Sequence, residues 1–90
     1  MSIKIHVLSS LQPFTNNQEV IEVKGGTVGE CINQLIQQYP EIERRLFDKN
    51  GKLLSYVGLY VNGEAAYPED LVKPVEDGDE IYILHIIGGG

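Results

Sequence analysis

The clearest helical pattern in the chain lies in Gly26-Thr-Val-Gly-Glu-Cys-Ile-Asn-Gln-Leu-Ile-Gln-Gln-Tyr-Pro40. Thr27 and Glu30 fit a capping box, in which the threonine hydroxyl accepts a hydrogen bond from the Glu30 N–H while the Glu30 carboxylate reaches back. Apolar residues then recur at helical spacing, opposite Asn33, Gln34, Gln37 and Gln38, at Val28, Ile32, Leu35, Ile36 and Tyr39. Pro40 cannot continue a helix, so the pattern predicts one amphipathic helix that covers the core.

Strand patterns lie on both sides of this helix. We predict strands, in chain order, at residues 3–7, 19–24, 56–61, 64–67 and 80–87. Apolar residues alternate in Ile3-Lys-Ile-His-Val7, which is typical of a half-buried strand. Pro13 and Asn16-Asn17 favour turns, so they predict a fairly long connection between the first two strands. Asn62-Gly63 is a strong hairpin signal, because both residues tolerate the positive φ that a tight hairpin turn requires.

The order of these elements predicts an α+β fold. One helix can cover only one face of a sheet, and the first and last strands are apolar enough to lie side by side at its centre. We therefore expect a β-grasp (ubiquitin-like) roll, a mixed four- to five-stranded sheet with one main helix on one face. A single β-grasp domain would span residues 1–87. The three glycines at 88–90 would form a flexible C-terminal tail, because glycine loses the most backbone entropy on ordering.

Composition limits the partners and the location that the sequence predicts. Thirteen acidic against seven basic residues give a net charge of −6, which repels nucleic-acid phosphates and favours a protein partner with a basic docking surface. No apolar run approaches the ~20 residues that a membrane-spanning helix needs, so we expect no membrane association. The chain starts with a strand pattern in place of a signal peptide, which predicts a cytoplasmic location. We expect the free protein to be a monomer.

The titratable side chains form no catalytic or metal-binding pattern. Cys31 is the single cysteine, which excludes an internal disulfide, and its place near the apolar stripe predicts a buried side chain. His6 and His85 are expected on adjacent strands, but two histidines without a third ligand make a poor metal site. The acidic run Glu76-Asp-Gly-Asp-Glu80 lacks the EF-hand spacing and is interpreted as a solvated turn. We therefore expect no enzyme activity, no metal and no bound cofactor.

A set of short motifs extends over nearly the whole chain in order. They are Leu11-Gln-Pro13 with Thr15, Gly26-Thr-Val-Gly-Glu30, Tyr39-Pro40, Arg45-Leu-Phe-Asp48, Tyr60-Val-Asn-Gly-Glu64, Asp77-Gly-Asp-Glu80 and the terminal glycines. With these motifs the chain resembles the ubiquitin-like sulfur carriers of the molybdopterin and thiamine pathways, the MoaD/ThiS type. The resemblance is greatest to the CysO-like branch, which acts with a cysteine synthase that uses O-phosphoserine.

The resemblance implies carrier chemistry at the C-terminus. An E1-like enzyme would use ATP to adenylate Gly90, and a sulfur nucleophile would then displace AMP to leave a terminal thiocarboxylate. A sulfur-accepting synthase would use that sulfur to make cysteine, another sulfur-containing amino acid or a cofactor. Gly89 and Gly90 would be the essential pair, because residues without Cβ atoms can enter a narrow channel, and Gly88 would lengthen the arm.

The predicted sheet also offers a docking surface for such enzymes. Tyr60, Tyr82 and Leu84 are expected to point away from the helix, where aromatic anchors suit a protein interface. Ile86 and Ile87 precede the tail and are expected to join this surface. Single exposed apolar residues are also ordinary on soluble proteins, so these positions alone do not establish docking.

Three other functions stay open from the sequence. A ubiquitin-like modifier would use the same activated Gly90 and join it to a lysine of a target protein. The small subunit of molybdopterin synthase would keep its tail inside a partner's active site. A plain binding module would not depend on Gly89 and Gly90 at all.

Overall fold

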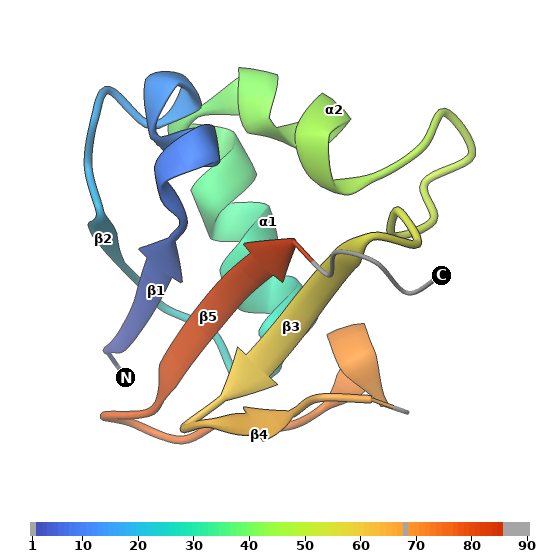
Figure 1. Cartoon of the computed structure of the whole chain (residues 1–90). Helices are drawn as coiled ribbons and strands as arrows, with labels where there is room; N and C mark the ends of the chain where they lie inside the picture. Colours follow the sequence, from blue (N-terminus) through green and yellow to red (C-terminus); the bar gives the residue numbers. More distant parts are fainter. Residues whose placement is uncertain (1, 68, 86–90) are drawn as a thin grey trace.

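Five strands form one mixed sheet in the order β2-β1-β5-β3-β4, with the helices gathered on one face (Figure 1). The computed structural model describes residues 2–67 and 69–85. The strands are β1 (Ile3–Val7), β2 (Val20–Val23), β3 (Val57–Val61), β4 (Glu64–Ala65) and β5 (Glu80–His85). The helices are α1 (Val28–Gln38) and α2 (Glu43–Leu46), with 3-10 helices at Ser9–Phe14, Pro40–Ile42 and Asp70–Val72.

The two strands furthest apart in sequence form the centre of the sheet. β1 and β5 run parallel, with Ile5 opposite Ile81, and all the other strand pairs are antiparallel. This arrangement confirms the predicted β-grasp roll and the central position of the first and last strands. Residues 86 and 87 and the glycines at 88–90 lie outside the described residues, so the boundary between domain and tail stays a prediction.

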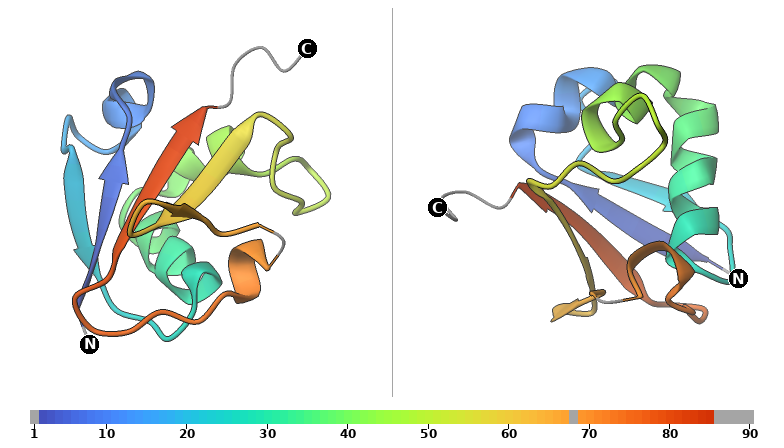
Figure 2. Two further views of the ribbon diagram at one scale, coloured as in Figure 1. Left: turned by 60° about the horizontal axis from the view of Figure 1, so that its bottom comes forward. Right: turned by 90° about the vertical axis from the view of Figure 1, so that its right-hand side faces the viewer.

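Helix α1 begins at the predicted capping box. The Glu30 N–H donates to Thr27 Oγ1 at 3.1 Å, and the Glu30 carboxylate accepts from the Gly26 N–H at 2.8 Å. Its inward side buries the predicted apolar positions Val28, Ile32 and Leu35, with Ile36 and Tyr39 partly buried. Each fully buried aliphatic side chain stabilises the fold by roughly 1.5–3 kcal/mol, so α1 is the main cover of the core. Figure 2 shows that it crosses one face of the sheet and leaves the other without a helix.

Two connections differ from the sequence prediction. The link between β1 and β2 contains the 3-10 helix Ser9–Phe14, where only a long turn was expected. Buried Thr15 ends that helix, and its hydroxyl donates to the Gln18 carbonyl at 2.9 Å. The return strand β4 is only two residues long, because Ala66 turns into the core and leaves Tyr67 exposed.

The predicted Asn62-Gly63 hairpin turn is confirmed. Asn62 and Gly63 both have positive φ, 51° and 87°, as the hairpin between β3 and β4 requires. Asp48 closes the turn after α2, since its carboxylate accepts from the N–H groups of Asn50 and Lys52. In the part of the chain that the structure describes, no helix has the length and apolar character needed to cross a bilayer.

Candidate docking face

The uncovered side of the sheet is the candidate functional surface, called here the open face. Figure 1 looks directly onto it, with α1 behind the strands. Alternation along the strands places the buried residues toward α1 and the other residues on the open face. Its side chains from the central strands are Lys4, His6, Tyr60, Glu80, Tyr82 and Leu84.

Three of the predicted docking residues meet at the centre of this face. Tyr60 and Tyr82 are direct cross-strand partners on β3 and β5, and Leu84 lies opposite Gly58. Tyr60, Tyr82 and Leu84 line a shallow depression on this face together with Asn62, Gly63 and Glu80. Leu84 keeps 40% of its surface exposed, which is high for a large aliphatic residue in a strand next to the sheet centre. The predicted placement of the three residues is therefore confirmed, whereas their docking role stays a prediction.

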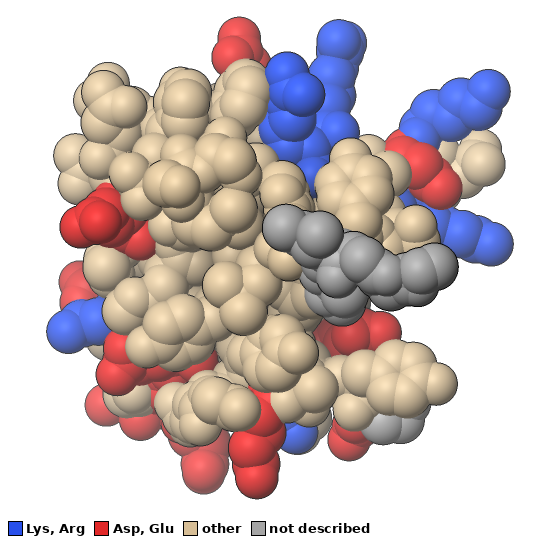
Figure 3. All heavy atoms as spheres, viewed as in Figure 1, with Lys and Arg blue, Asp and Glu red and all other residues tan. Residues whose placement is uncertain are grey.

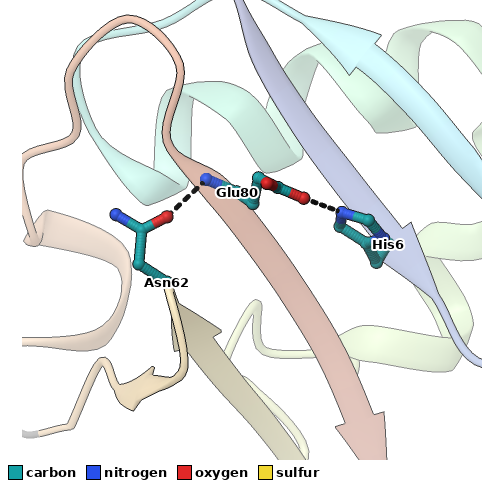
Figure 4. Close-up of polar contacts among 3 residues, drawn as sticks. All are labelled: His6, Asn62 and Glu80. Carbon is teal, nitrogen blue, oxygen red and sulfur yellow. Dashed lines mark hydrogen bonds and ion pairs between the residues drawn. The ribbon is translucent and has the colours of Figure 1, made fainter.

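His6 on β1 contacts this cluster by stacking on Tyr82. The His6 and Tyr82 rings stack with centroids 4.2 Å apart and planes 8° from parallel. The His6 Nε2 donates to the Glu80 carboxylate, with nitrogen and oxygen 2.5 Å apart (Figure 4). Both contacts hold the imidazole across β5, so Tyr82 has little freedom to change rotamer.

Asn62 fastens the hairpin to the start of β5. Its side-chain oxygen accepts from the Glu80 N–H at 2.9 Å (Figure 4), and its amide nitrogen donates to the Asp79 carboxylate at 2.9 Å. The Asp79 carboxylate also accepts from the Glu76 N–H, at 2.8 Å. The bond from the Glu76 backbone, followed by the bond from Asn62, lowers the pKa of Asp79 below its ordinary value. The acidic run therefore forms a turn, as predicted, but side-chain hydrogen bonds also hold this turn in place.

Sequence reasoning missed this role of Asn62. The sequence identified Asn62 only as a hairpin residue, and its side-chain partners lie 17 and 18 residues further along the chain. No local pattern links the two segments, and only the pairing of β3 with β5 brings them together.

His6 and His85 lie on the adjacent strands β1 and β5, as expected, but they are not neighbours. β1 ends at Val7, opposite Ile83, so His85 extends beyond β1 and pairs with Val57 on β3. Its ring meets Tyr56 edge-on, with centroids 5.4 Å apart. Within residues 2–67 and 69–85, no group of three His, Cys, Asp or Glu side chains is arranged to hold a metal ion.

Cys31 is buried within α1, as predicted. Its side chain is fully covered, and this burial, followed by the charge of Glu30, raises the pKa of the thiol to about 11. The thiol therefore stays protonated at neutral pH, which disfavours a role in sulfur transfer.

The remaining predicted site residues lie outside the described part of the chain. They are Ile86, Ile87, Gly88, Gly89 and Gly90. They follow His85 directly in sequence, after the strand that carries Tyr82 and Leu84. Their roles stay predictions.

Comparison with known proteins identifies the family. The sequence model of the ThiS family matches residues 5–90, which is nearly the whole chain and includes the glycines at its end. The chain belongs to the ThiS family. This confirms the resemblance to the MoaD/ThiS type of ubiquitin-like proteins.

Two CysO proteins are similar to this chain over nearly its whole length. The sulfur carrier protein CysO of Mycobacterium tuberculosis is 33% identical over 93 aligned residues, which cover 100% of both chains. Its crystal structure matches with a TM-score of 0.87 at 32% identity, covering 94% of this chain and 99% of that chain. The crystal structure of an Amycolatopsis orientalis BexX/CysO complex contains a chain that matches with a TM-score of 0.87 at 30% identity, covering 98% and 99%.

An archaeal relative carries a different name. Small archaeal modifier protein 1 of Haloferax volcanii is 32% identical over 71 residues, which cover 78% of each chain. The ThiS-family chain is therefore similar both to a protein named as a sulfur carrier and to one named as a modifier.

Proposed function

We propose that this ThiS-family protein is a sulfur carrier, whose Gly90 is adenylated by an E1-like enzyme and converted to a thiocarboxylate that donates sulfur in biosynthesis. The observation that carries this proposal is similarity to CysO over the full length of both chains. The family match extends to residue 90, so it includes the residues at which the chemistry would occur. The recipient product would be cysteine, another sulfur-containing amino acid or a cofactor.

The chemistry requires activation because a carboxylate is a poor electrophile. The Gly90 carboxylate attacks the α-phosphorus of ATP, and pyrophosphate leaves to give an acyl-adenylate. Sulfide then adds to the acyl carbon and AMP leaves with the shared electron pair, so the terminus ends as a thiocarboxylate. Gly89 and Gly90 suit both steps, because residues without Cβ atoms leave the carbonyl open to attack within a narrow channel.

In this proposal the described domain supplies recognition and the enzymes supply catalysis. The open face would dock on them through Tyr60, Tyr82 and Leu84, joined by Ile86 and Ile87. An aromatic cluster with a restrained rotamer is well suited to this, because little side-chain entropy is lost when a partner binds. The BexX/CysO complex supports a protein partner, since it contains a relative of similar fold and 30% identity.

Protein modification is a second candidate function. The observation that favours it is the 32% identity to small archaeal modifier protein 1. The activation step would be the same, but a lysine amine of a target protein would attack the activated Gly90 in place of sulfide, forming an isopeptide bond.

Intact-mass spectrometry separates these functions. The protein is incubated with ATP, sulfide and the E1-like enzyme of its host, and we expect a mass gain equal to the difference between a sulfur and an oxygen atom. Deletion of Gly89 and Gly90 together should abolish the gain, whereas Gly88→Ala should retain it, because Gly88 only lengthens the arm. An unchanged mass, with an enzyme that is active on a related carrier, would overturn the sulfur-carrier proposal. Lysine-linked conjugates detected in host extracts would favour the modifier.

A further inference from the structure

The charges around the open face are unevenly distributed. In Figure 3 most of the visible Lys and Arg atoms lie at the upper right, over α2 and the turn after it, with some Asp or Glu atoms beside them, and Asp and Glu predominate along the left and lower edges. We call the four cations of this region the basic margin: Arg44, Arg45, Lys49 and Lys52. We call the carboxylates of β4 and of the turn into β5 the acidic margin: Glu64, Glu76, Asp77, Asp79 and Glu80. The uncharged centre with Tyr60, Tyr82 and Leu84 lies between them.

The basic margin concentrates charge in an otherwise acidic protein. It holds four of the seven Lys and Arg residues, and all four are exposed. Among the described residues the only ion pair is His6 with Glu80, so no carboxylate there neutralises these four cations at contact distance. The nearby Asp48 carboxylate instead accepts two backbone N–H groups of its own turn.

The basic margin lies at the end of the sheet where β5 ends. Arg44 and Lys49 line a surface depression together with Tyr56, with Glu43 and Asp48 also in its lining, and the Tyr56 ring meets His85 edge-on. His85 is the last described residue, and residues 86–90 follow it. Five extended residues span at most about 17 Å, so Gly90 can reach only a site close to this end. The acidic margin lies at the start of β5, the opposite end of the same face (Figure 1).

We propose that the basic margin pairs with an acidic surface of the activating enzyme, beside the channel that takes Gly90. The proposal rests on the carrier function proposed above and adds the chemistry of the partner surface. An apolar centre is non-directional, so Tyr60, Tyr82 and Leu84 alone do not select one end-to-end orientation of the carrier. Two margins of opposite charge favour one orientation of the carrier on the enzyme. Only in that orientation would residues 86–90 reach the channel. Charges at the edge of an interface act mainly on the association rate and on the choice of partner.

Charge reversal with a matched control tests the proposal. The test variant is Arg44→Glu with Lys49→Glu, and the control is Lys24→Glu with Gln34→Glu and Gln37→Glu. Both variants lower the net charge by four, and none of the three control residues belongs to a margin. Gln34 and Gln37 are exposed residues of α1, which lies on the covered side of the sheet. Arg45 is kept, because its guanidinium lies 4.4 Å from the centre of the Phe14 ring and contributes to packing.

The measurement is ATP–pyrophosphate exchange by the activating enzyme at varied carrier and salt concentrations. For the test variant we expect KM for the carrier to rise about 10- to 100-fold with kcat nearly unchanged. We also expect KM to depend less on the salt concentration than it does for wild type. The control should stay within about threefold of wild type. Circular dichroism confirms that both variants fold.

Equal KM values for test and control would overturn the inference. So would an unchanged KM together with binding of wild type, but not of the test variant, to anionic phospholipid vesicles, which would assign the basic margin to a membrane. A wild-type protein that is not adenylated at all would instead contradict the proposed function, so the two failures are distinguishable.

Discussion

The imidazole of His6 lies flat against the ring of Tyr82, with centroids 4.2 Å apart, although the two residues belong to opposite ends of the sequence. The parallel pairing of β1 with β5 places them directly opposite each other. Glu80 holds the other side of the imidazole through its contact with Nε2. The stacked His6 ring therefore favours this orientation of Tyr82 on the open face.

Replacement of His6 tests this orientation. His6→Ala removes the stacking partner, so Tyr82 must be ordered on binding, which costs about 0.5–1.5 kcal/mol or about a 2- to 10-fold higher Kd. His6→Phe keeps a stacked ring and should stay near wild type. Isothermal titration with the activating enzyme measures both. Identical Kd values for wild type and His6→Ala would show that Tyr82 needs no support.

A charge at the centre of the open face should block docking. Leu84→Asp places a carboxylate where an apolar contact is expected, and burying it without a partner should raise KM for activation at least about tenfold. Val72→Asp is the matched control, since Val72 is an exposed aliphatic residue (71%) outside the open face. Equal effects of the two substitutions on pyrophosphate exchange would place the docking surface elsewhere.

Two substitutions at Asn62 separate its backbone from its side-chain role. Asn62→Gly keeps the positive φ but loses both side-chain hydrogen bonds, so it should lower the free energy of unfolding by about 1–2 kcal/mol. Asn62→Ala adds the cost of a left-handed conformation, about 1 kcal/mol more. Urea denaturation measures both values. Alanine as stable as glycine would contradict the left-handed geometry of the hairpin.

The contact of α1 with the 3-10 helix Asp70–Val72 depends on Gly29. A Cβ at Gly29 would lie 2.9 Å from the Leu71 carbonyl oxygen, so Gly29→Ala must push the two elements apart. We expect a loss of about 1–3 kcal/mol in stability despite the better helix propensity of alanine. Gly26→Ala is the control, because its Cβ would meet only a Glu30 side-chain oxygen at 3.6 Å. A higher Tm for Gly29→Ala than for Gly26→Ala would contradict this close contact.

The thiol of Cys31 should be unreactive in the folded protein. Its pKa is raised to about 11, so at pH 8 it is protonated as well as buried, and a thiol-specific reagent should react only after unfolding in urea. The folded state holds this proton more tightly than the unfolded state. The resulting stabilisation is therefore complete below about pH 9 and is lost as the pH rises toward 11. Rapid labelling of the native protein at pH 8 would contradict the burial.

Local patterns in the sequence were sufficient to predict the secondary-structure elements and the family. The apolar stripe of α1, the alternation in β1 and the Asn62-Gly63 turn each depend on residues within a few positions of one another. Such local patterns can be read because one helical or extended period decides which side chains are buried. They were sufficient to predict the β-grasp roll and the placement of Tyr60, Tyr82 and Leu84 on its open face.

Which distant side chains meet depends on how the strands pair in the folded protein. The register between β1 and β5 places His6 over Tyr82 and leaves His85 beside Tyr56, and no pattern within either strand encodes that offset. The same holds for Asn62, which reaches Asp79 only once β3 pairs with β5. Register is set by packing both strands against α1, a non-local condition, so the arrangement of the docking face follows from the whole fold and from no single stretch of sequence.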